Sequence, residues 1–177
     1  MEKLERISRE LVHKGVVIDL YQDKVKDENG LVKTYDSIIH KGAAAVIPVL
    51  DNGKILMVKQ YRNILDRFTL EIPAGGLNDI DEPTKDAAAR ELEEETGYKS
   101  DNLELLLRIK TTVAFCNENI DIYLAKDLVP SKQNLDEGEF IDVYEYSIEE
   151  LVEMVYNCTI QDSKTVCAIM AYYNKIK

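Results

Sequence analysis

The chain has 177 residues and a net charge of −11, and 45% of its residues are hydrophobic. This length and composition are typical of one soluble globular domain that can bury a core. The negative charge argues against a nucleic-acid partner, because phosphate backbones are bound by basic surfaces. No apolar run can span a bilayer, and the charged segment Met1–His13 lacks the apolar stretch of a secretory signal. We therefore expect a cytoplasmic protein that binds neither nucleic acid nor membrane.

The first forty residues are predicted to form an arm before the main domain. Residues 1–13 are expected to be a short polar helix or an irregular segment. Alternation from Val16 to Tyr21 then predicts a strand. Asn29-Gly30 supplies a tight turn, so that Leu31–His40 returns as the second strand of an antiparallel hairpin.

A second hairpin is predicted to follow directly. Its strands are the apolar segments Ala43–Leu50 and Lys54–Tyr61, and its turn is Asp51-Asn52-Gly53. Thr69–Ile72 is a further short strand, which stops at Pro73.

A central helix is predicted between two sets of strands. Asp81 or Thr84 can cap its start, Pro83 sits where a missing N–H does no harm, and Gly97 is a natural stop. The later predicted elements are strands at 103–112, 120–128 and 140–146, a helix from the capping box of Ser147 and Glu150 through Tyr156, and a last helix at 163–175 with an apolar stripe of Val166, Ile169, Met170 and Tyr173.

The order of these elements predicts an α+β fold in which a mixed β-sheet is sandwiched between helices, with an N-terminal antiparallel hairpin. We assign residues 1–40 to the N-terminal arm and residues 41–177 to the main domain.

The central helix concentrates negative charge on one face. At 3.6 residues per turn, Glu91, Glu94 and Glu95 fall within an arc of roughly 100°. Arg90 can pair with Glu94 at i+4, but one arginine leaves surplus charge. Glu93 is expected to point the other way, towards solvent. Three such glutamates on an ordinary helix are only a solvated face, whereas at a functional site they suit magnesium or manganese, which take oxygen ligands.

The spacing around the glutamates decides between these interpretations. The pattern G-x5-E-x7-R-E-L-x-E-E-x-G is formed by Gly76, Glu82, Arg90, Glu91, Leu92, Glu94, Glu95 and Gly97. It resembles the Nudix box, the signature of hydrolases that act on nucleoside diphosphates linked to another moiety. The resemblance implies the Nudix fold and a catalytic metal site with two or more ions, Mg²⁺ or Mn²⁺.

The resemblance also implies roles for the residues of the box. Glu91, Glu94 and Glu95 would bind the metals, and Glu82 would support the site. Arg90 would orient the glutamates, so that both Arg90 and Glu94 belong to the catalytic machinery. Gly76 would let the loop approach the site closely.

Two segments before the box resemble the ADP-ribose pyrophosphatase branch of the family. They are Gln60-Tyr61-Arg62 and Glu71-Ile72-Pro73-Ala74-Gly75-Gly76. This resemblance implies that the Ala74 carbonyl is a further metal ligand. It also implies that Arg62 contacts a substrate phosphate and that Glu71 belongs to the substrate-binding region.

Residues after the box extend the resemblance. The acidic loop from Leu135 to Ile141 would prepare the attacking water, with Glu137 favoured over Glu139 as the base. Glu118 occupies a family position near the terminal ribose. Where relatives often carry Ser-Pro-Gly, this chain has Thr112-Val113-Ala114-Phe115, a departure that concerns the sugar pocket.

The resemblance implies hydrolysis of ADP-ribose, or of a related nucleoside diphosphate sugar, by a homodimer whose N-terminal arms pack together. The alternatives are a Nudix pyrophosphatase acting on another nucleoside diphosphate derivative or on nucleoside triphosphates, and a non-catalytic sensor of nucleotide sugars. The complete box argues against the sensor.

Overall fold

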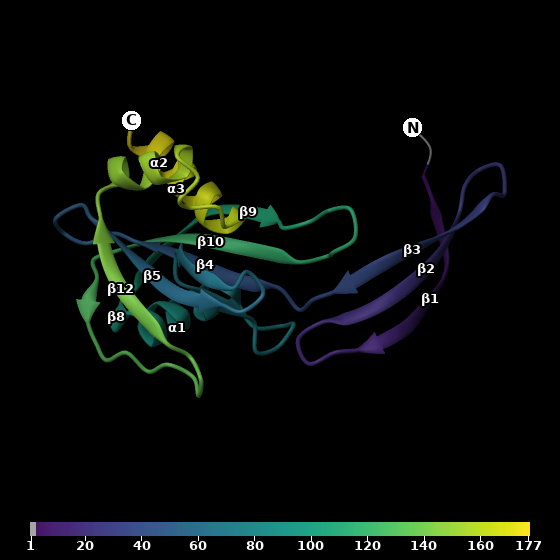
Figure 1. Ribbon diagram of the computed structural model, residues 1–177, viewed down its shortest axis with the longest axis horizontal. Helices are drawn as coiled ribbons and strands as arrows, with labels where there is room; N and C mark the ends of the chain where they lie inside the picture. The colour runs from purple at the N-terminus through teal and green to yellow at the C-terminus, as the bar shows by residue number, and fades with distance from the viewer. Residues whose placement is uncertain (1–2) are drawn as a thin grey trace. The chain divides into compact units, whose positions relative to one another are not determined.

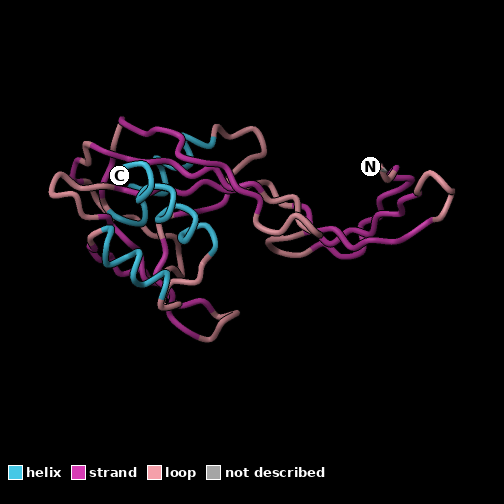
Figure 2. The backbone as a smooth tube through the Cα atoms, turned by 90° about the horizontal axis from the view of Figure 1, so that it is seen from above, coloured by secondary structure: helices cyan, strands magenta, loops and turns pink. Residues whose placement is uncertain are grey.

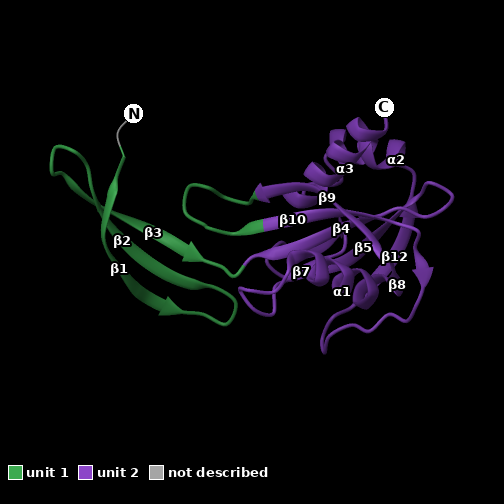
Figure 3. Cartoon of the chain, turned by 180° about the vertical axis from the view of Figure 1, so that it is seen from behind, with its two compact units in different colours: residues 1–41, 110–119 green, residues 42–109, 120–177 purple. Residues whose placement is uncertain are grey.

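The computed structural model of the protein describes residues 3–177. The chain divides into two compact units, one of residues 1–41 and 110–119 and the other of residues 42–109 and 120–177 (Figure 3). Every helix of the described residues belongs to the second unit, and the first is built of strands and loops (Figures 1 and 2).

The first unit is a three-stranded antiparallel sheet. Its strands, in the order β1-β2-β3, are Glu5–Lys14, Asp19–Lys26 and Val32–Ile39. Asp23 of β2 is 7% exposed and links the three strands, because Arg9 of β1 donates to both carboxylate oxygens at 2.6 Å and the hydroxyl of Ser37 of β3 donates at 3.1 Å. The predicted hairpin with its turn at Gly30 (φ 83°) is confirmed.

The prediction of a helix or irregular segment at residues 1–13 is wrong where the structure describes it. Residues 1 and 2 lie outside the described residues, and Glu5–Lys14 is strand β1. Leu4, Ile7 and Leu11 have helical spacing, but β1 pairs with β2 from end to end and so satisfies its backbone in a sheet. Pairing with a neighbouring strand therefore overrides the local pattern.

The second unit contains a mixed four-stranded sheet, in the order β7-β4-β10-β9, and an antiparallel three-stranded sheet, β12-β5-β6, with a small pair β11-β8. Strands β4 and β10 run parallel. The strands are β4 Ala43–Pro48, β5 Ile55–Arg62, β6 Arg67–Glu71, β7 Ala74–Gly76, β8 Tyr98–Lys99, β9 Asn102–Lys110, β10 Asn119–Lys126, β11 Val129–Pro130 and β12 Ile141–Tyr146. The helices are α1 Thr84–Thr96, α2 Ile148–Tyr156 and α3 Ser163–Ile176.

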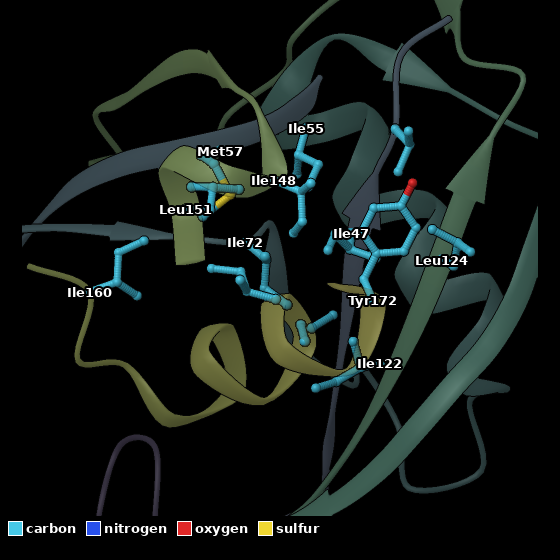
Figure 4. Close-up of a cluster of buried hydrophobic side chains, with 14 of the residues drawn as sticks. Ile47, Ile55, Met57, Ile72, Ile122, Leu124, Ile148, Leu151, Ile160 and Tyr172 are labelled. Atoms are coloured by element: carbon cyan, nitrogen blue, oxygen red, sulfur yellow. The ribbon is translucent and has the colours of Figure 1, made fainter. Parts of the chain in front are cut away.

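Strand β4 is buried on both faces and separates two parts of the core. Ala44 and Val46 face helix α1 and pack with Leu92, whereas Ala45 and Ile47 face the side of α2 and α3. In Figure 4 the ring of Tyr172 from α3 lies beside Ile47 and Leu124. The predicted fold class, a mixed sheet between helices, is thereby confirmed.

The predicted second hairpin is wrong in its pairing. Gly53 does make the turn with φ 81°, but β4 and β5 meet only in the bridge Val49–Ile55 and then enter different sheets. Strand β4, which is apolar on both faces, pairs with β10 and β7 inside the core, while β5 pairs with β12 and β6.

Helix ends follow the sequence only in part. Helix α1 ends at Gly97 (φ 71°) as predicted, but its N-cap is Pro83, and the Thr84 hydroxyl instead donates to Asp121 at 2.8 Å. The predicted capping box of α2, Ser147 with Glu150, is present. The buried side of α3 is centred on Thr165, Ala168, Ile169 and Tyr172, so the predicted stripe is displaced.

No helix within residues 3–177 has the length and apolarity required to cross a membrane.

Candidate functional site

The glutamates of helix α1 lie near strand β7, and Arg90 of the same helix pairs with two of them. Arg90 Nη1 donates to Glu91 Oε1 at 2.6 Å and to Glu94 Oε2 at 2.9 Å, the latter being the predicted i+4 pair. Its Nη2 reaches the Gly76 carbonyl at 3.3 Å, and its Nε lies 3.5 Å from Glu82 Oε1. Arg90 therefore ties the helix to the loop that precedes it.

Glu82 supports the site by accepting a hydrogen bond from the backbone of the same loop. Its Oε2 accepts the N–H of Asn78 at 2.6 Å, while its Oε1 faces Arg90. The Glu82 carboxylate thus connects the two ends of the loop between β7 and α1.

The close approach between the loop and the helix occurs at Gly75. A Cβ added to Gly75 would overlap the carboxylate of Glu91, so a larger residue cannot stand there while Glu91 keeps its place. A Cβ added to Gly76 meets nothing within 4 Å. The glycine that the close approach requires is therefore Gly75, one residue before the one expected from the sequence.

These groups surround a cavity of about 160 Å³. Its polar lining is mainly oxygen, because four carboxylates face it and Arg90 supplies the single guanidinium. It is lined by Ala74, Gly75, Gly76, Asn78, Arg90, Glu91, Glu94, Asp136 and Glu139. Of the acidic-loop residues, Glu139 thus lines the cavity and Glu137 does not.

Glu95 lies behind the cavity, bonded to the backbone of β7. Its carboxylate accepts the N–H of Ala74 at 3.0 Å, and the residue is 4% exposed. Burial raises the pKa of Glu95 to about 8 against that hydrogen bond, and the neighbouring charges of Glu91 and Glu139 add to the rise. Burial also raises the pKa of Glu91, although Arg90 opposes it.

The donor set suits a hard divalent cation. The side chains that face the cavity offer mainly carboxylate oxygen, and burial raises the pKa of Glu91 and of Glu95, so a cation bound beside them would favour their charged forms. Among residues 3–177, no three His, Cys, Asp or Glu side chains already stand together as a cluster able to hold a metal ion.

Arg62 and Glu71 belong to a second cavity, of about 480 Å³, between β6 and the start of α3. Arg62 Nε and Nη2 bind the two oxygens of Glu71 at 2.8 and 2.7 Å. Lys164 of α3 also reaches Glu71, with Nζ 2.5 Å from Oε2. Burial would raise the pKa of Glu71, but the bonds from Arg62 and Lys164 lower it to about 2.

The structure brings predicted residues together in two groups and leaves Glu118 apart from them in the sequence of the first unit. The first is the cavity on α1, and the second is the pair of Arg62 and Glu71. Glu118 belongs to the first unit, where its Oε1 lies 3.3 Å from Nδ1 of His40.

Sequence reasoning missed the participation of Gly75, Asn78, Asp136 and Lys164. For Gly75 a signal existed in the Gly75-Gly76 pair, and for Lys164 none did, because its partner lies 93 positions away.

Comparison with known proteins agrees with this site. A model of the NUDIX domain matches residues 40–166. The chain is 41% identical to the ADP-ribose pyrophosphatase of Bacillus subtilis (strain 168), over 96% of this chain and 93% of that protein. It is 40% identical to the methanol dehydrogenase activator of Bacillus methanolicus, over 92% and 89%. The crystal structure of an ADP compounds hydrolase matches with a TM-score of 0.87 at 18% identity, covering 98% of this chain and 94% of that one, so the two share a fold.

Proposed function

The chain belongs to the Nudix hydrolases, and we propose that it splits the pyrophosphate of ADP-ribose into AMP and ribose 5-phosphate. The observation that carries the proposal is the cavity where the glutamates of α1 meet the Ala74–Gly76 loop. The identity to an ADP-ribose pyrophosphatase over nearly the whole chain supports the substrate.

Nudix hydrolases in general need a divalent metal, and here we propose Mg²⁺, with Mn²⁺ as the alternative and two or more ions. Glu91, Glu94, Glu95 and the Ala74 carbonyl would be the ligands. Ions held there would supply Lewis acidity to the pyrophosphate oxygens and make the attacking water more acidic. The oxygen-rich lining of the cavity supports this assignment.

Glu139 is our proposed general base, in preference to Glu137. It lines the cavity, and its Oε2 accepts the N–H of Asp136 at 3.2 Å, which restrains the carboxylate. In the reaction the oxygen of water attacks one phosphorus, the bond from that phosphorus to the bridging oxygen breaks, and Glu139 accepts the proton of the water. Arg90 keeps the glutamates in place during this step.

Arg62 is proposed to bind a phosphate of the substrate, with Glu71 holding its guanidinium. Two of its nitrogens bond Glu71, so Nη1 remains to donate to a ligand. Gly76 is proposed to lie against the substrate, since a Cβ added there would meet nothing within 4 Å, and Glu118 is proposed to contact the terminal ribose.

The experiment is a panel assay of ADP-ribose, other nucleoside diphosphate sugars, dinucleotides and nucleoside triphosphates, each with magnesium and with manganese. We expect the highest kcat/KM for ADP-ribose, with AMP and ribose 5-phosphate as the products separated by chromatography. A higher kcat/KM for a triphosphate, or for a sugar nucleotide with another base, would contradict the substrate. Absence of phosphate-bond cleavage on every compound would favour the sensor.

The assembly and location are proposed on separate grounds. A two-fold homodimer is supported by the exposed apolar residues of the first unit, among them Ile7, Val12 and Val32. A cytoplasmic location is supported by the three cysteines, Cys116, Cys158 and Cys167, which are free thiols as in a reducing compartment.

A second candidate function follows from the relative named methanol dehydrogenase activator. Adding the protein to a methanol dehydrogenase assay tests it, because activation that needs an intact Glu94 would link that effect to the same site.

A further inference from the structure

Lys164 is a buried cation beside Glu71 to which the proposed function gives no role. It is the second residue of α3, is 9% exposed, and lines the larger cavity. Its ammonium lies 2.5 Å from Glu71 Oε2 and 3.0 Å from Asp162 Oδ2. A buried ammonium is stable only beside such partners, and these two carboxylates fix its position.

The carboxylate that Lys164 holds is also the one that holds Arg62. Glu71 offers one oxygen to Arg62 Nε, and its other oxygen is shared between Arg62 Nη2 and Lys164 Nζ. The Thr69 hydroxyl donates to the first oxygen at 2.7 Å. Both oxygens are thus held from two sides, so the carboxylate cannot turn without breaking several charged hydrogen bonds. A fixed carboxylate imposes its orientation on a bidentate guanidinium.

The attachment of α3 to the sheet does not depend on Lys164 alone. The hydroxyl of the next residue, Thr165, is fully buried and accepts the N–H of Ile72 at 3.1 Å. Ile169 and Tyr172 add apolar contacts with the core. The helix is therefore docked by other groups, and what the Lys164 ammonium adds is its bond to Glu71.

We propose that Lys164 is a positioning residue for substrate binding, which acts through Glu71 to hold Arg62 Nη1 towards a phosphate-bearing ligand in the cavity between β6 and α3. This inference rests on the proposed function in one respect, namely that Arg62 binds the substrate phosphate. It assigns a role in substrate recognition to a helix that supplies no residue of the carboxylate cavity.

The test is a double-mutant cycle on substrate binding. KM and kcat for ADP-ribose are measured for the wild type, Lys164→Met, Arg62→Ala and the double variant. Lys164→Met should raise KM by about tenfold, as loss of a charged hydrogen bond does, with kcat changed far less. Arg62→Ala should raise KM at least as much. The double variant should be no worse than Arg62→Ala, because Lys164 acts through Arg62.

Controls separate positioning from stability. Lys164→Arg keeps the charge and should restore most of the affinity, whereas Lys175→Met removes the exposed pair with Glu104 and should leave KM unchanged. Thermal unfolding of each variant shows whether it is folded. If Lys164→Met does not fold, Lys164→Gln, which keeps a donor without the charge, carries the same cycle.

Three outcomes would overturn the inference. They are an unchanged KM in folded Lys164→Met, effects of the two substitutions that multiply in the double variant, and a raised KM in Lys164→Met when Arg62→Ala is silent. The last would also remove Arg62 from the proposed function. If the wild type does not cleave ADP-ribose, the proposed substrate fails by itself, and the cycle is measured with the panel compound that the wild type does cleave.

Discussion

At the scale of single residues, Gly75 and Gly76 are neighbours with different surroundings. A methyl group at Gly75 would displace the Glu91 carboxylate, whereas one at Gly76 would enter open space. We expect Gly75→Ala to lower kcat strongly with little loss of stability, because the end of a flexible side chain can move aside. Gly76→Ala is the matched control, and any loss there should appear in KM. Equal losses of kcat in the two variants would contradict this account.

Glu93 and Glu94 provide a second matched pair on the same helix. Glu94 lines the cavity, while Glu93 accepts a hydrogen bond from Ser131 outside it. Glu94→Gln changes little volume, so folding should survive, but kcat should fall by about two to three orders of magnitude. Glu93→Gln should be nearly silent in the same assay. Similar losses in both would show that Glu94 has no special role.

Glu71 predicts how stability depends on pH. Its pKa of about 2 in the folded protein lies below the ordinary value, so its contribution is fully present above the ordinary value and is lost as pH falls through about 2. The shift corresponds to roughly 3 kcal/mol at neutral pH. Glu71→Gln should therefore destabilise the protein at pH 7 in urea unfolding. The difference from wild type should shrink steadily below pH 4, and a constant difference would contradict the assignment.

Residues that interact within one helix could be predicted, and residues that meet across the fold could not. The Arg90–Glu94 pair follows from 3.6 residues per turn alone. The partner of Glu71 could not be predicted, because its pairing with Lys164 depends on how α3 docks. The choice between Glu137 and Glu139 likewise depends on which way a loop turns, since both stand in the same acidic run.

At the scale of elements, the start of α2 is a direct test of local sequence. Ser147 and Glu150 cap it reciprocally, each side chain accepting a backbone N–H of the other. Ser147→Ala should lower the free energy of unfolding by about 1 kcal/mol without changing kcat/KM. Ser163 is exposed at the start of α3, and its hydroxyl has no hydrogen-bond partner among residues 3–177. Ser163→Ala should therefore change neither the free energy of unfolding nor kcat/KM. A larger effect for Ser163 would mean that the capping box contributes little.

Elements with a strong local signal were predicted, and errors arose where pairing decided. The stop at Gly97 predicted the end of α1, and the capping box predicted the start of α2. Strand β1 is exposed along its whole length, so burial left no alternating pattern to reveal it. The turn at Gly53 suggested that β4 and β5 pair, but β4 is buried on both faces and takes β10 as its partner. Such partners come from distant sequence and are invisible to local patterns.

At the scale of the whole molecule, the exposed apolar residues of the first unit predict self-association. We expect light scattering at micromolar concentration to give twice the 20.2 kDa of one chain. Charged substitutions at Ile7 and Val12, which are each 52% exposed on β1, should shift the mass towards the monomer without unfolding the protein. A fully active protein with the mass of one chain would rule out the dimer.

The docking of α3 has a consequence for the timing of folding. Its bonds to Glu71 and Ile72 join positions 93 residues apart, so the loop that closes between them is long. Strand β6 and helix α1 leave the ribosome well before the helix that fixes Glu71. The nascent protein can therefore bring the glutamates of α1 together early. The ligand site that we propose at Arg62 is completed only when α3 docks, among the last steps of folding.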